Sequence, residues 1–285
     1  MGHGEFLRHE GDTSEEEVIK IATDWRSAEL NAQEYAILEL SEQLTQTPIL
    51  VGRDDLMPLR EAGLDEDQIL AAVLAICYWN FTTRTADMLG VELEDSDKPA
   101  DLVDAFDGIV ASRKASQKDA AATSSHEAGV AESESEYGVS FLSTMPGNDL
   151  FAVLQARPAV AAADAATRLA IESNLPPRWQ SLIGVCVAGS LGLDHQIEAL
   201  RGDLDPELAK KVVTNWPGAP LDAKEMALLG FAHAGTVAQA TITEQEIDEL
   251  RSVGLSDRDI LAAAALIVYN NYALRASQAL GVSVR

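Results

Sequence analysis

Two stretches of this chain repeat one pattern: ILAAVLAICYWNFTTRTADMLGV at 69–91 and ILAAAALIVYNNYALRASQALGV at 260–282. Each is rich in alanine and large aliphatic residues and ends in Leu-Gly-Val, which is typical of a long, closely packed helix that stops at a left-handed glycine. Both also carry the spacing YxNxxxR, at Tyr78, Asn80 and Arg84 in the first stretch and at Tyr269, Asn271 and Arg275 in the second. The pattern predicts two equivalent helices.

The repeat extends well beyond these helices. Residues 25–91 align with residues 216–282 without a gap, at a constant displacement of 191 positions, and about one position in three is identical. Matches such as Trp25 with Trp216 and Glu34 with Glu225 lie far from the strongest block. We interpret the pattern as an internal duplication.

Both copies carry the same helix boundaries. Asn31 and Asp222 each precede a glutamate three positions on, which is the spacing of a capping box. A second helix is expected at about 54–62 and 245–253, ending at Gly63 and Gly254. A third begins at the caps Asp65 and Ser256 and ends at Gly90 and Gly281. Each copy therefore contains at least three helices.

The second copy has a preamble that the first largely lacks. We expect one or two helices over 148–173, an apolar helix over 176–191, a short one over 194–201, and one from Asp205 to Trp216. The first copy has only 13–24 to match the last of these. With 5% aromatic residues and abundant alanine, the composition favours an all-α fold.

Composition excludes several classes of function. The formal net charge of −25 repels phosphate backbones and anionic lipids, so we expect no nucleic-acid partner and no membrane association. The two cysteines and five scattered histidines form no zinc or other metal spacing, and no cofactor motif is present. The opening residues lack a signal-peptide core, and the longest apolar run is too short for a spanning helix. We expect a cytoplasmic protein.

The segment between the copies differs in composition. Its centre is rich in Ala, Ser and Glu, with little to bury, so we expect a flexible acidic linker. The predicted organisation is an incomplete unit at 1–96, a linker at 97–147 and a complete unit at 148–285. Within the linker, 101–112 has apolar spacing compatible with a short docking helix or with no structure at all.

Taken together, these stretches resemble the AhpD-like alkylhydroperoxidase and carboxymuconolactone decarboxylase superfamily, in its peroxidase-related branch. The first copy is similar to the C-terminal half of a family unit, the second to a complete unit, and the two matches cover about four fifths of the chain. The resemblance implies helical bundle units that associate, here packed as a pseudo-dimer, with antioxidant peroxidase chemistry on a small apolar or peroxide substrate.

The peroxidases of this family use a CxxCxxxH motif, in which a thiolate attacks the peroxide and a second cysteine closes a disulfide. In the equivalent stretch, VCVAGSLGLDHQIEALR, no register places a cysteine at either motif position. His195 remains the candidate for the motif histidine, flanked by Asp194 and Glu198, a set suited to proton transfer. The alternative is that Asp194 caps a helix and His195 is a half-exposed residue of its first turn.

In the first copy, His3 falls where the motif histidine would lie, with no thiol before it. We expect either that translation begins upstream or that this site was lost; His3 is otherwise a residue of a disordered terminus. Cys77 and Cys186 lie in apolar runs and are interpreted as core residues. The repeated Tyr, Asn and Arg positions are interpreted as buried polar groups that bond neighbouring helices.

Three functions remain open at this point. The first is a degenerate family member that keeps the scaffold and an apolar pocket without thiol turnover. The second is a cysteine-free acid/base enzyme of the carboxymuconolactone decarboxylase type, with His195 moving the proton. The third is a non-catalytic interaction scaffold. An incomplete first unit exposes an apolar face, so we expect the units to pack together and the chain to form homo-oligomers.

Overall fold

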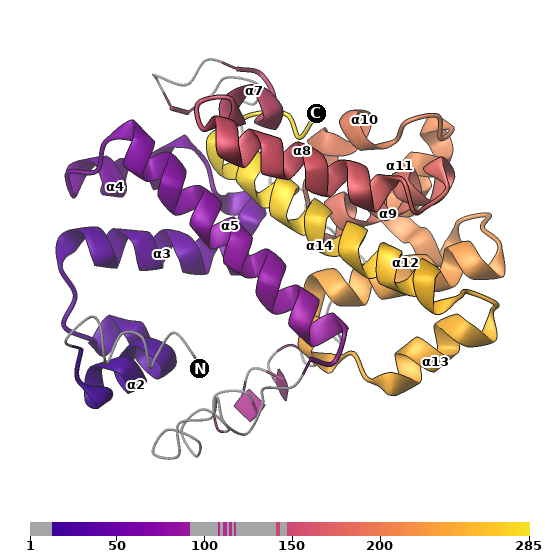
Figure 1. The fold of residues 1–285 in the computed structure, drawn as a ribbon, viewed down its shortest axis with the longest axis horizontal. Coiled ribbons are helices and arrows are strands. Elements are labelled where there is room, and N and C mark those ends of the chain that lie inside the picture. The colour runs from indigo at the N-terminus through magenta and orange to yellow at the C-terminus, as the bar shows by residue number, and fades with distance from the viewer. Residues whose placement is uncertain are drawn as a thin grey trace.

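The computed structural model describes residues 13–91, 108, 111–112, 114–115, 117, 141–142 and 147–285. Their regular elements are all helices, which confirms the all-α prediction for these residues; no strand occurs among them (Figure 1). The N-terminal half (13–91) contains α2 (Glu15–Asp24), α3 (Ala32–Gln46), α4 (Met57–Glu61) and α5 (Glu66–Met88). The C-terminal half (147–285) contains α7 (Leu150–Leu154), α8 (Pro158–Glu172), α9 (Pro177–Ser190), α10 (Ile197–Leu200), α11 (Pro206–Asn215), α12 (Ala223–Val237), α13 (Glu244–Ser252) and α14 (Asp257–Leu280).

The predicted helix boundaries are formed by the expected capping groups. Asn31 Oδ1 accepts from the backbone amides of Gln33 and Glu34, and the Glu34 carboxylate accepts in return from the Asn31 amide. Asp222 and Glu225 repeat this capping box at the start of α12. Such reciprocal bonds satisfy amides that have no partner within the helix. Local sequence therefore sets where these helices begin.

The helix boundaries recur between the two halves. Displacement by 191 residues carries α2 onto α11 and α3 onto α12 with the same first and last residues, and carries the start of α5 onto the start of α14. One element differs: α13 is a continuous helix, whereas its counterpart begins as a 3₁₀ turn at Arg53–Leu56 and becomes helical only in α4. Pro58 accounts for the difference, because proline has no amide hydrogen for the first helical turn.

The two long helices α5 and α14 pack against each other at the centre of the molecule (Figure 1). A buried arginine on each helix reaches into the other half. Arg84 on α5 donates to the Thr236 carbonyl at 2.7 Å and to Gln239 Oε1 at 2.8 Å. Arg275 on α14, only 1% exposed, donates to the Thr45 carbonyl at 3.2 Å. Each contact joins a long helix of one half to the C-terminal end of a helix in the other half, α5 to α12 and α14 to α3.

The halves differ in what covers these helices. In the C-terminal half, α9 packs against both α12 and α14, α11 packs on α9, and α8 lies along α14 (Figure 1). The N-terminal half has no described counterpart of α8 or α9, so one side of α3 and α5 remains uncovered by such helices. Of the predicted docking segment 101–112, all but Gly108, Ala111 and Ser112 lies outside the described residues. Within the described ranges, no helix combines the length and the hydropathy needed to cross a bilayer.

Candidate functional site

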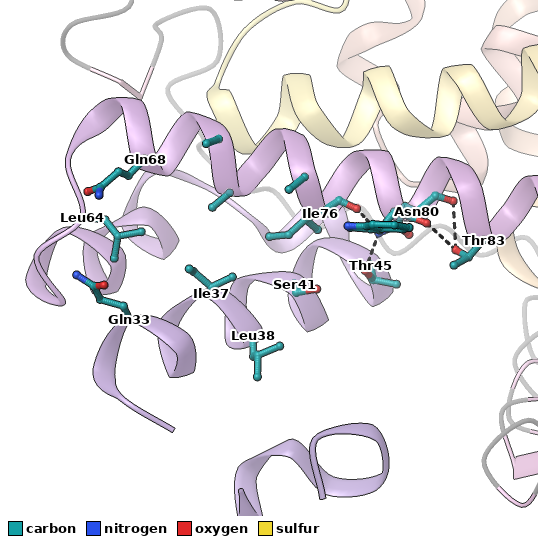
Figure 2. A pocket seen from close by; sticks show the side chains of 14 residues that line it. Gln33, Ile37, Leu38, Ser41, Thr45, Leu64, Gln68, Ile76, Asn80 and Thr83 are labelled. Atoms are coloured by element: carbon teal, nitrogen blue, oxygen red, sulfur yellow. Dashed lines mark hydrogen bonds between the residues drawn. The ribbon is translucent and has the colours of Figure 1, made fainter. Parts of the chain in front are cut away.

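A groove of about 730 Å³ runs between α3 and α5, and we call it the α3–α5 groove. Figure 2 shows its two walls, one from each helix, with Leu64 and Gln68 at one end and Asn80 and Thr83 at the other. The walls are largely apolar or small, and their residues are Gln33, Ile37, Leu38, Ser41, Thr45, Leu64, Gln68, Ala71, Ala72, Ala75, Ile76, Trp79, Asn80 and Thr83. This is the size of groove that binds small ligands or a helical segment.

The groove ends in an aromatic and a polar group. The Trp79 side chain is 45% exposed, and its ring packs edge-on against Tyr78 with centroids 5.5 Å apart. At the same end, Asn80 Nδ2 donates to Thr45 Oγ1 at 2.9 Å and to the Ile76 carbonyl at 3.1 Å (Figure 2). The bond between Asn80 and Thr45 therefore ties the two walls together at this end.

The corresponding surface of the C-terminal half is closed by α9. Asn271 repeats the bond of Asn80, donating to Thr236 Oγ1 at 3.1 Å. Asn270, the counterpart of Trp79, is only 2% exposed and lies beside Gly184 of α9. A glycine there lets the two helix backbones approach closely. The same wall positions are thus core in one half and groove in the other.

The predicted site residue His195 lies in a 3₁₀ turn, Asp194–Gln196, on the surface of the C-terminal half. Its surroundings desolvate the imidazole and lower its pKa, while a hydrogen bond from the ring to Gln278 of α14 acts in the opposite direction. Gln278 also donates to the Val51 carbonyl of the N-terminal half at 2.7 Å. Desolvation therefore favours the neutral form of His195.

The two carboxylates predicted beside His195 lie in different settings. Partial desolvation raises the pKa of Asp194 although this residue is exposed. Glu198 is also exposed, and its carboxylate pairs with Arg201 Nε at 2.8 Å. Asp194 is not the helix cap considered above, because the cap position of this turn is Leu193. His3 lies outside the described residues.

Both cysteines are core residues in the structure, as interpreted from the sequence. Cys77 and Cys186 are free thiols with almost no exposed surface. Burial raises the pKa of each thiol to about 12, so both are protonated near neutral pH. The thiolate is the form that attacks a peroxide, and neither thiol supplies it.

One pair of reactive residue types went unnoticed in the sequence. Ser190 of α9 and His233 of α12 share a hydrogen bond of 2.9 Å, and both are half-buried. They lie 43 residues apart and match no spacing motif, so only packing of the two helices brings them together. Across the described part of the chain, no three His, Cys, Asp or Glu side chains converge in a way that could hold a metal ion.

No family model, curated protein or solved structure matches this chain.

Proposed function

We propose that this chain is an AhpD-like, carboxymuconolactone decarboxylase-related protein that has lost thiol peroxidase chemistry and acts as a binding protein through the α3–α5 groove. The observation that carries the proposal is the groove itself, because most of its wall positions correspond to buried core in the other half. A buried asparagine at one end, walls that are largely apolar or small, and an exposed tryptophan are typical of a ligand surface.

The two cysteines support the proposed loss of thiol peroxidase chemistry. Neither half offers a dithiol, and both cysteines have a pKa of about 12. The test is turnover of tert-butyl hydroperoxide with dithiothreitol as the reductant. We expect no rate above the rate without protein, and no change in Cys77→Ala or Cys186→Ala. A rate that disappears in either variant would contradict the proposal.

The binding role is tested with the neutral apolar dye Nile red. Its fluorescence is expected to rise with the wild-type chain and to fall to background in Ala75→Trp, because Ala75 is an exposed wall residue whose enlargement fills the groove. The matched control is Ala166→Trp, also an exposed helical alanine, on α8. If Ala75→Trp binds the dye as well as the control does, the groove is not the binding site.

We also infer that the two halves form a pseudo-dimer. In a two-fold pair, residue i contacts residue j of the partner and the reverse contact is also made. Arg84 reaches the Thr236 carbonyl and Arg275 reaches the Thr45 carbonyl, and both pairs are related by the same displacement of 191. Further association into homo-oligomers stays a prediction, to be measured by sedimentation equilibrium.

A second candidate activity rests on His195. Desolvation lowers the pKa of this imidazole, which favours its neutral, proton-accepting form, and Asp194 precedes it in the same 3₁₀ turn. This pair supports acid/base chemistry of the carboxymuconolactone decarboxylase type. Carboxymuconolactone is the substrate to test, and activity that survives unchanged in His195→Ala would remove His195 from the mechanism.

A further inference from the structure

We propose that the α3–α5 groove binds an amphipathic helix of a partner protein, lying parallel to α3, with a small apolar inner face and a basic residue near its N-terminal end. This inference deepens the proposed function and rests on it. In the C-terminal half, the equivalent surface of α12 and α14 already has a helix seated on it.

That helix is α9, and three contacts define how it lies on α12. Arg178 pairs with Glu225 at 2.5 Å, Cys186 Sγ contacts the Leu229 carbonyl at 3.6 Å, and Ser190 bonds His233. Residue numbers rise together along both helices, so α9 and α12 run parallel. On α12 the contacts fall at every fourth residue, which is one stripe of its surface.

The same stripe is present on α3. Its counterparts are Glu34, Leu38 and Glu42, of which Leu38 lines the groove. The Glu34 side chain is exposed, and its capping bond leaves acceptor capacity on the carboxylate. Glu42 lies further along and pairs with Arg26 at 2.6 Å. A helix seated like α9 would therefore meet a carboxylate beside its first turn, where α9 has Arg178.

The α5 wall favours a small apolar inner face on the partner. Ala71, Ala72 and Ala75 leave room for close approach of a helix, as alanine and glycine do between α9 and α14. At the far end, Trp79 replaces Asn270 and adds a large exposed ring. Buried tryptophans are frequent anchors of helix-in-groove complexes, so Trp79 is expected to contribute most of the affinity.

The negative charge beside the groove discriminates among the helices that could occupy it. A second copy of the chain carries the same net charge of −25 and the same Glu34 and Glu42. If two such grooves faced each other, these like charges would repel. The segment 101–112 of this chain contains Asp101, Asp104 and Asp107 and no basic residue, so it lacks the complement to Glu34. A partner helix with a small apolar face can pack against the α5 wall, and a lysine or arginine near its N-terminal end can pair with Glu34.

The experiment uses the full chain and a fluorescein-labelled peptide of residues 177–190 carrying Cys186→Ser, read by fluorescence anisotropy. We expect saturable binding, about tenfold weaker in Trp79→Ala and abolished in Ala75→Trp, with Ala166→Trp unchanged. Glu34→Gln keeps the capping bond and is expected to weaken binding about twofold to fivefold, with Glu61→Gln as the exposed control.

A charge swap tests the predicted orientation. Glu34→Lys should weaken the wild-type peptide and restore binding of the peptide carrying Arg178→Glu, with circular dichroism confirming that α3 remains helical. Equal loss with both peptides would place the basic end elsewhere and overturn the parallel register.

The outcomes separate the two proposals. If Nile red binds the wild-type chain but not Ala75→Trp, and the peptide does not bind, the groove remains a site for a small ligand and the partner helix is rejected. If neither probe binds, both proposals fall. A dimer that becomes monomeric only in Ala75→Trp would assign the groove to a second copy instead.

Discussion

The N-terminal and C-terminal halves share their helix boundaries but not their surroundings. Leu229 on α12 is fully buried beneath α9, whereas its counterpart Leu38 on α3 is half-buried at the edge of a groove. Likewise, Asn270 on α14 is buried, whereas its counterpart Trp79 on α5 is exposed. Capping and periodicity therefore fix the helices of both halves, while the presence of α8 and α9 decides whether a given face is core or surface.

The largest expected effect comes from placing a charge on this face in each half. Leu229→Asp buries a carboxylate without a partner and is expected to lower the free energy of unfolding by about 4 kcal/mol or more. Leu38→Asp, its matched control, can reach water and should cost about 1 kcal/mol. Urea unfolding followed by circular dichroism measures both. Equal losses would mean that the groove is closed in solution.

The next effect concerns the contact between halves. Arg275→Ala removes a fully buried side chain and its bonds to Thr45 and Asn271, and is expected to cost about 3 kcal/mol of unfolding free energy. Arg258→Ala, an exposed position in the first turn of the same helix, is the control and should change stability by about 0.5 kcal/mol or less. A small loss at Arg275 would argue that the crossing contacts are incidental to stability.

Sequence alone identified the helices and the repeat, because both depend on short-range signals. Gly63 and Gly254 have positive φ angles of +89° and +86°, as the predicted helix ends require. The groove was not predicted, since alanine at 71, 72 and 75 indicates a packed helix equally well. The α5–α14 contact joins the two halves, but it leaves the α3–α5 groove open.

The candidate site was harder to predict than the fold. His195, Asp194 and Glu198 lie close in sequence, but the Glu198 carboxylate pairs with Arg201. Gln278, which favours the protonated form of His195, lies 83 residues later in the chain. Ser190 and His233 meet only through helix packing. Contacts between distant helices depend on the tertiary arrangement, which spacing rules for a single helix do not encode.

The comparison also predicts local dynamics. Helix α11 buries Ala209, Val212 and Val213 against its neighbours, whereas α2 buries only Val18 among its described side chains. We expect the amides of α2 to open about 2 kcal/mol more easily and to exchange about thirtyfold faster than those of α11. Hydrogen exchange read by mass spectrometry compares the two helices within one sample. Equal protection would indicate that α2 is covered in solution.

The smallest effect is the pH dependence of stability that arises from His195 in the C-terminal half. Because its folded pKa lies below the usual value of about 6.5, the unfolded chain takes up the proton first as pH falls. The neutral imidazole therefore costs no stability above that pH, and stability declines as pH drops through about 6.5 toward the folded pKa. Proton NMR of the imidazole should give a midpoint below 6.5, and Gln278→Ala should lower it further, because the bond to Gln278 favours the protonated ring. A midpoint at or above 6.5 would mean that the imidazole is solvated, and acid/base chemistry at His195 would lose its structural support.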